Sequence, residues 1–149
     1  GGSGSDSLYG DAGADSLYGG SENDSLNGGS GSDFLYGGSG ADFLYGGSKD
    51  DSLYGGSGSD SLYGGSGNDR LTGGYGNDIF QINTGTGRDV ITDYTSGEDT
   101  IKLLGGLTED NISFRNVRGH TKIRHSSDLL AIVQNTIADD ITFTVAQSF

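Results

Sequence analysis

The first half of the chain repeats one pattern of apolar and polar positions every nine residues. From Gly1 to Gln81 the sequence divides without gaps into nine nonapeptides, of which GGSGSDFLY at residues 28–36 is typical. The eighth position is Leu in eight repeats and Phe80 in the ninth. One apolar side chain between two outward neighbours predicts a very short strand, with the apolar side chain pointing inward. The Gly, Ser and Asp residues of the first six positions predict a turn.

This period also predicts the architecture. One turn and one strand reverse the chain direction, so two repeats, 18 residues, should complete one coil. Nine repeats then give about four and a half coils, in a rod roughly 20 Å long. We therefore expect an all-β protein whose residues 1–81 form a right-handed parallel β-roll.

The second half, residues 82–149, loses the nonapeptide and has a different pattern. It is expected to form a C-terminal antiparallel β segment that caps the open end of the roll, because terminal repeats need a cap. Residues 141–145 alternate apolar and polar side chains, whereas residues 129–133 are a continuous apolar run. The predicted strands are Thr100–Leu104, Ile112–Val117, Thr121–Arg124, Leu129–Val133 and Ile141–Val145, with turns at 116–119 and 125–128.

Composition narrows the class of protein. The 149 residues include no Cys, which excludes disulfides and thiolate metal sites. The net charge of −13 argues against nucleic acid as a partner, since phosphate binding needs clustered Lys and Arg. No apolar run approaches the roughly 18 residues that a membrane span requires. The sequence opens inside a repeat at Gly1, so we expect a piece of a longer protein, most simply a monomer.

The sixth position of the repeat predicts a metal site. It is Asp in all nine repeats: Asp6, Asp15, Asp24, Asp33, Asp42, Asp51, Asp60, Asp69 and Asp78. An 18-residue coil places each Asp beside the Asp 18 positions away, in two columns with seven pairs. Neighbouring carboxylates repel each other unless a cation lies between them. Oxygen ligands without His or Cys favour Ca²⁺ over transition metals, and the octahedral geometry that Mg²⁺ demands makes it a poorer fit. About seven Ca²⁺ ions are therefore expected in the roll.

A further ion is possible where the roll ends. Asp89, which ends the degenerate loop Gly85-Thr86-Gly87-Arg88-Asp89, could bind one more Ca²⁺ together with Asp93, Asp99 and Glu98. An acidic loop without an ion is the alternative.

These residues resemble the RTX, or haemolysin-type calcium-binding, repeat proteins, whose nonapeptide forms a parallel β-roll. The resemblance is close over residues 1–81 and looser to the C-terminus, through GNDIFQI, GRDVITDY, EDTIKL and the segment from LLAIVQN to AQSF. It implies that each ion takes an Asp carboxylate and two backbone carbonyls from each of two loops. Carried over, Gly38, Gly40 and Asp42 face Gly55, Ser57 and Asp60 across one ion. The glycines assigned to such loops are Gly29, Gly31, Gly38, Gly40, Gly56, Gly58, Gly65, Gly67, Gly74 and Gly76.

Three repeats depart from the pattern. Asp11 replaces a second-position Gly, and Glu22 and Lys49 replace fourth-position Gly residues. Their carbonyls remain as ligands if the backbone adopts the loop conformation, which costs about 1 kcal/mol or more without Gly.

Other features support weaker hypotheses. Tyr18, Tyr36 and Tyr54 should stack on one face, and Tyr45 and Tyr63 on the other, either as a platform for a ligand or as cross-strand pairs that stabilise the sheet. Arg115, Arg118, Lys122 and Arg124 could bind acidic polysaccharide or form a solvated strand face. His125, Ser126 and Asp128 are interpreted as turn residues rather than a hydrolase triad.

The sequence thus predicts a non-catalytic, calcium-binding module of a secreted bacterial protein, which folds on extracellular calcium. The resemblance further implies export by type I secretion machinery, with the signal in the C-terminal region. The alternative is a polysaccharide- or surface-binding module. A flexible Gly/Ser linker is disfavoured, because linkers do not keep Asp and Leu in register nine times.

Overall fold

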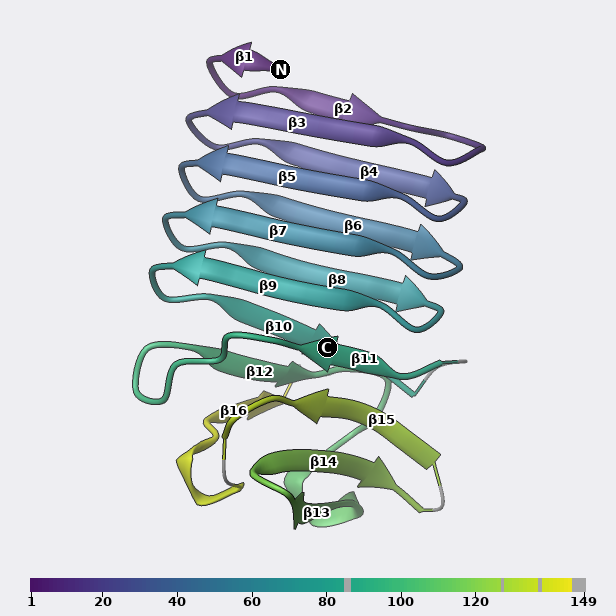
Figure 1. The fold of residues 1–149 in the computed structure, drawn as a ribbon, viewed down its shortest axis with the longest axis vertical. Coiled ribbons are helices and arrows are strands. Elements are labelled where there is room, and N and C mark those ends of the chain that lie inside the picture. The colour runs from purple at the N-terminus through teal and green to yellow at the C-terminus, as the bar shows by residue number, and fades with distance from the viewer. Residues whose placement is uncertain (85–86, 127, 137, 146–149) are drawn as a thin grey trace.

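The repeats build two parallel sheets that face each other and share one core. In a computed structural model, which describes residues 1–84, 87–126, 128–136 and 138–145, the chain forms a parallel β-solenoid of about six turns. From β1 to β12 successive strands alternate between the two sheets, so the coils stack along the long axis of the molecule (Figure 1). The all-β prediction and the β-roll are confirmed.

The described residues contribute nine strands to one sheet and seven to the other. The nine-stranded sheet has the order β1 (Gly2–Ser3), β3 (Ser16–Ser21), β5 (Phe34–Ser39), β7 (Ser52–Ser57), β9 (Arg70–Tyr75), β11 (Asp89–Ile91), β15 (Asp128–Val133), β14 (His120–His125) and β13 (Ile112–Val117). The seven-stranded sheet has the order β16 (Phe143–Val145), β12 (Thr100–Leu103), β10 (Ile79–Ile82), β8 (Ser61–Ser66), β6 (Phe43–Ser48), β4 (Ser25–Ser30) and β2 (Ser7–Tyr9).

The strand register follows the 18-residue coil that the sequence predicts. Leu17 pairs with Leu35, Leu35 with Leu53, and Leu53 with Leu71 in the nine-stranded sheet. The eighth-position side chains point between the sheets, and those from Leu26 to Phe80 are fully buried. The core of the roll is therefore a ladder of one apolar side chain per repeat.

The strands are longer than the sequence indicated. They have six residues rather than three, because the first three residues of the following repeat continue the parallel pairing, as in Gly38 with Gly56 and Ser39 with Ser57. Composition alone predicts that these Gly and Ser residues form turns. Their backbone N–H and C=O groups nevertheless form a ladder whatever the side chain. The turn itself is confined to positions four to six.

Beyond Gln81 the coil continues with a longer period. Val90 of β11 pairs with Arg70, a separation of 20 residues, and Thr100 of β12 pairs with Ile79, a separation of 21. β12 is parallel to both β10 and β16, and β11 is parallel to β15. The prediction of an antiparallel arrangement is therefore wrong for the strands that begin at Thr100 and near Ile141, which extend the parallel roll.

The antiparallel part is a three-stranded end made by β13, β14 and β15. The hairpin turn between β13 and β14 contains only Arg118 and Gly119, since Val117 pairs with His120. Two short 3₁₀ helices, Glu109–Asn111 and Ala138–Asp140, flank this end. Two predicted features, the loop residues 85–86 and the final segment 146–149, lie outside the described residues.

The roll and the C-terminal region share one hydrophobic cluster. It runs from Leu26 through Ile82 and Ile91 to Val133, so the core is continuous across the predicted boundary at residues 81–82. Buried Tyr94 joins the two regions: its hydroxyl donates to the Asp99 carbonyl at 2.9 Å and accepts from the Thr142 N–H at 2.7 Å. Among the described residues, no helix has the length and apolar character needed to cross a membrane.

Candidate metal centre

The sixth-position Asp residues form two columns, one along each edge of the roll. Each Asp directly precedes a strand, so alternate repeats place their Asp on opposite edges. Within a column, the backbone N–H of one Asp donates to Oδ1 of the Asp one coil further on. The distance is 2.8 Å from Asp24 N to Asp42 Oδ1 and from Asp42 N to Asp60 Oδ1. The expected 18-residue pairing is thus the observed one.

The other carboxylate oxygen of each Asp has no hydrogen-bond partner within the described part of the chain. The nine oxygens are the buried Oδ2 atoms of Asp6, Asp15, Asp24, Asp33, Asp42, Asp51, Asp60, Asp69 and Asp78. A buried carboxylate oxygen without a partner is strongly unfavourable, and a bound cation removes that cost. One such oxygen recurs in every coil on each edge.

The first glycine of each repeat leaves space beside this oxygen. A Cβ on Gly37 would lie 2.4 Å from Asp42 Oδ2 and 2.6 Å from the carbonyl oxygen of Gly55 in the next coil. A Cβ on Gly19 would meet Asp24 Oδ2 and the Gly37 carbonyl in the same way. The carboxylate and a first-position carbonyl therefore converge on one space, as the resemblance implied for Asp42 and Gly55. This convergence recurs at seven first-position glycines: Gly1, Gly10, Gly19, Gly28, Gly37, Gly46 and Gly55.

The second and fourth glycines have another role, since they adopt positive φ angles. Gly38 has φ of 117° and Gly40 of 125°. The three departures take the same region: φ is 67° at Asp11, 75° at Glu22 and 79° at Lys49. The Glu22 carbonyl lies against Gly40 as the Gly40 carbonyl lies against Gly58. The loop conformation, and the carbonyl that it presents, therefore survive at Glu22.

The columns are electrostatically unfavourable without a cation. Burial, together with the neighbouring carboxylates of the column, raises the pKa of Asp51 and of Asp60 to about 7, although the backbone N–H that each accepts opposes the shift. Burial likewise raises the pKa of Asp78 to about 6. Burial, and then the Asp69 carboxylate, raises the pKa of Asp89 to about 8. Desolvated, mutually repelling carboxylates of this kind favour a bound cation.

The acidic residues after the repeats do not gather into one site. Asp89 continues one column, where its Oδ1 accepts from Asp69 N at 3.3 Å. Asp99 continues the other column, where its Oδ1 accepts from Asp78 N at 2.9 Å and its Oδ2 from Thr95 N at 2.7 Å. Asp93 binds the N–H groups of Gly73 and Gly74 with its two oxygens. A shared ion held by Asp89, Asp93 and Asp99 together is therefore not what this geometry offers.

The donor set fits calcium. Within the described residues, no three His, Cys, Asp or Glu side chains form a cluster that could hold a metal. Each candidate site instead brings an unpartnered Asp oxygen of a column beside a first-position backbone carbonyl, and both donors are oxygen. Ca²⁺ accepts six to eight oxygen ligands in flexible geometry, whereas transition metals prefer nitrogen or sulfur.

The other candidate residues lie away from the columns. Tyr18, Phe34 and Tyr54 pack on one face with ring centroids 5.8 and 5.6 Å apart, and Tyr45 stacks on Tyr63 at 5.2 Å on the other. Tyr36 pairs in register with both Tyr18 and Tyr54, and its ring centroid lies 6.4 Å from that of Tyr18, so the predicted tyrosine columns are present. His125 lies opposite Asp128 in the β14–β15 hairpin, with Ser126 in its turn at φ of 54°.

A parallel solenoid with two columns of unpartnered Asp oxygens defines a class of repeat protein that binds a hard cation. The sequence matches the RTX calcium-binding nonapeptide repeat family, described in four copies, over residues 1–35, 18–53, 36–71, 45–80 and 54–91. These matches cover more than half of the chain, so the chain belongs to this family of calcium-binding repeats. Modules of this family are generally non-catalytic.

Solved structures with a similar fold come from larger proteins. The extracellular lipase LipA of Serratia marcescens matches with a TM-score of 0.50 and 16% identity, over 90% of this chain and 38% of the lipase. This chain thus spans less than half the length of that enzyme. A subunit of the mannuronan C5-epimerase of Azotobacter vinelandii matches with a TM-score of 0.50 and 22% identity, over 96% of this chain and 94% of the subunit. At these identities the similarity shows the fold alone. No curated protein matches the sequence.

Two features of the site were missed at the sequence level. One is the steric role of the first-position glycine, although its presence in all nine repeats was a visible signal. The other is the continuation of both columns by Asp89 and Asp99, because their spacings of 20 and 21 residues depart from the nine-residue period.

Proposed function

We propose that this chain is a non-catalytic module that folds when its two Asp columns take up Ca²⁺ outside the cell. The observation that carries the proposal is the row of nine buried Oδ2 atoms without partners. Folding buries these oxygens, so a cation that satisfies them contributes its binding free energy to folding. Calcium modules of extracellular proteins bind at about 0.1–1 mM, a range that leaves the columns unloaded in a cytoplasm poor in calcium.

The ion count follows from the two kinds of pair. Seven pairs lie within the repeats, and in each the Oδ2 atom converges with a first-position carbonyl. In the pairs Asp69–Asp89 and Asp78–Asp99 the first Asp also donates its backbone N–H to Oδ1 of the second. However, the atoms nearest to the space at Gly64 and Gly73 include no backbone carbonyl. We infer seven full sites, with weaker binding at the two terminal pairs.

Equilibrium dialysis with radiolabelled calcium tests this count. The chain should bind about seven ions in the main phase, and Asp89→Asn should leave that number unchanged. Asp42→Asn should reduce it, because Asp42 takes part in two of the seven pairs. Binding of only one or two ions, or equal uptake of Mg²⁺, would contradict the proposed sites.

Export through type I secretion machinery is a further part of the proposal. What supports it is the charge of the repeats: residues 1–81 carry 12 acidic and 2 basic side chains, which repel each other until calcium is bound. A passenger protein fused upstream should reach the medium only when such an exporter is co-expressed. Export without it would count against this assignment.

Binding of acidic polysaccharide is the second candidate function. The observation that favours it is the concentration of basic side chains on the β13–β14 hairpin, where Arg115, Arg118, Lys122 and Arg124 stand in a chain of net charge −13. Retention on an acidic glycan matrix, lost in Arg115→Gln/Lys122→Gln, would support it. A chain that passes through such a matrix like a neutral protein would exclude it.

A further inference from the structure

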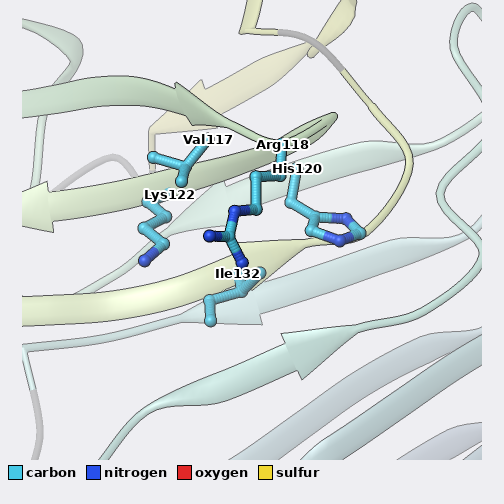
Figure 2. A pocket seen from close by; sticks show the side chains of 5 residues that line it. All are labelled: Val117, Arg118, His120, Lys122 and Ile132. Atoms are coloured by element: carbon cyan, nitrogen blue, oxygen red, sulfur yellow. The ribbon is translucent and has the colours of Figure 1, made fainter.

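The antiparallel end of the molecule contains a cavity that the calcium columns do not use. It has a volume of about 530 Å³ and is lined by Val117, Arg118, His120, Lys122 and Ile132. Figure 2 shows the Arg118 guanidinium between the Lys122 side chain and the His120 ring, above Ile132. The cavity thus combines three nitrogen-bearing side chains with two aliphatic ones.

The register of the sheet explains why these side chains meet. On β14, Thr121 and Ile123 point into the core and are fully buried, so His120 and Lys122 point to the opposite face. Val117 pairs with His120, and Ile132 pairs with Lys122, which brings one aliphatic side chain beside each of them. Arg118 reaches the same space from the hairpin turn.

The charge of this cavity is positive and uncompensated. Neither the Arg118 nor the Lys122 side chain makes a hydrogen bond or ion pair with another described residue, and residues 111–127 contain no Asp or Glu. Nδ1 of His120 accepts the Asn135 N–H at 3.0 Å, so in the neutral ring Nε2 carries the hydrogen and remains a donor. The polar side chains that line the cavity therefore offer it hydrogen-bond donors.

Arg118 occupies a turn position where its side chain is unfavourable for the stability of the hairpin. Arg118 and Gly119 have φ angles of 55° and 79°, which together with the two-residue connection indicate a type I′ turn. Asn, Asp and Gly are preferred at the first position of this turn, because other side chains are strained there. An Arg at this position is unfavourable for the hairpin, whereas it places a guanidinium at the cavity.

We propose that this cavity binds an oxyanion on a small ligand, a carboxylate or a sulfate ester on a sugar-sized skeleton. Arg118 and Lys122 bind the anion, His120 donates a third hydrogen bond through Nε2, and Val117 and Ile132 contact the carbon skeleton. This inference rests on the second candidate function and specifies its site and ligand chemistry. It does not depend on the number of calcium ions.

Titration of the calcium-loaded full chain, followed by two-dimensional amide NMR, tests the proposal. The probes are glucuronate for a carboxylate, glucose 6-sulfate for a sulfate ester, and methyl glucoside as the neutral control. Saturable shifts should centre on residues 117–122 and 132 with one or both acidic probes and be absent with methyl glucoside. Which acidic probe binds identifies the source of the anion.

Three variants make the result specific. Arg118→Asn removes the guanidinium and supplies a residue that the turn prefers, so the hairpin should be no less stable while the affinity falls about tenfold or more. Lys122→Gln should weaken binding to a similar degree. Arg70→Gln removes an equal charge from the exposed first residue of β9 and should leave the affinity unchanged.

Several results would overturn the proposal: no saturable shift with either acidic probe, equal shifts with methyl glucoside, or equal losses in Arg70→Gln and Lys122→Gln. Circular dichroism of the same samples reports calcium-dependent folding separately. A failure of anion binding is therefore distinguishable from a failure of the calcium proposal.

Discussion

At the scale of single residues, the glycines of the repeat serve two different physical needs. The first glycine leaves space for a carboxylate and a carbonyl, as at Gly37, whereas the second and fourth permit positive φ, as at Gly38 and Gly40. The sequence predicted the backbone role from composition. The need for space at the first glycine could not be predicted in the same way, because it depends on the carbonyl of the next coil, 18 residues away.

Replacing Lys49 by Gly should stabilise the folded chain modestly. Lys49 has φ of 79°, and a non-Gly side chain there costs about 1–2 kcal/mol. Gly loses about 0.5–1 kcal/mol more conformational entropy on folding, so we expect a net gain between about 0 and 1.5 kcal/mol. Chemical denaturation in saturating calcium measures it. Gly58→Lys, at the same repeat position, is the reciprocal variant and should destabilise; a Lys49→Gly chain less stable than the parent would contradict the strain.

An interior Asp should matter more than a terminal one. Oδ1 of Asp42 accepts the Asp24 N–H, and Oδ2 of Asp42 lies without a partner beside the Gly55 carbonyl of the following coil. Asp6 stands in the first repeat, so among the residues of this chain no earlier coil donates an N–H to its carboxylate. Asp42→Ala should therefore raise the calcium midpoint of folding more than Asp6→Ala. Circular dichroism during calcium titration measures both midpoints, and equal midpoints would exclude the paired columns.

At the scale of structural elements, the sequence predicted the strands better than their partners. The nine-residue period determined the register from β2 to β10, since a fixed spacing allows only one stack. Beyond Gln81 the sequence pattern predicts the strands near residues 100–104 and 141–145, but it does not predict that they pair in parallel. An alternating strand has the same pattern in parallel and antiparallel sheets, so its partner depends on long-range contacts such as those of Tyr94.

Tyr94→Phe should weaken the junction between the roll and its cap. The variant keeps the ring against Phe80, whose centroid is 6.5 Å away, but removes the hydroxyl that joins Asp99 and Thr142. Loss of these hydrogen bonds should cost about 1–3 kcal/mol of unfolding free energy. Denaturant unfolding in saturating calcium measures it. Tyr75→Phe is the matched control, because Tyr75 is 85% exposed and should change little.

At the scale of the whole molecule, the two columns make stability depend on pH in opposite ways with and without calcium. In the calcium-free folded chain, burial raises the pKa of Asp51 and Asp60 to about 7, against about 3.9 for an unfolded Asp. The folded state therefore binds more protons between these values. Stability from protonation is present at low pH and is lost as pH rises through about 7.

Thermal unfolding in calcium-free buffer at pH 5 and pH 8 checks this dependence. We expect more residual β structure and a higher melting temperature at pH 5. With calcium, protons compete for the same carboxylates, so the calcium midpoint should rise as pH falls from 8 to 5. A calcium midpoint that does not change with pH would show that the column carboxylates are not the ligands.

The central claim is that calcium supplies free energy that folding requires. The most direct measurement is the hydrodynamic radius of the chain, recorded together with far-ultraviolet circular dichroism while Ca²⁺ is raised to a few millimolar, with Mg²⁺ as the control. The account predicts an expanded chain without calcium, which contracts and gains β signal in one steep transition, and little response to Mg²⁺. A calcium-free chain at neutral pH that is already compact, with a melting temperature unaffected by calcium, would contradict the account.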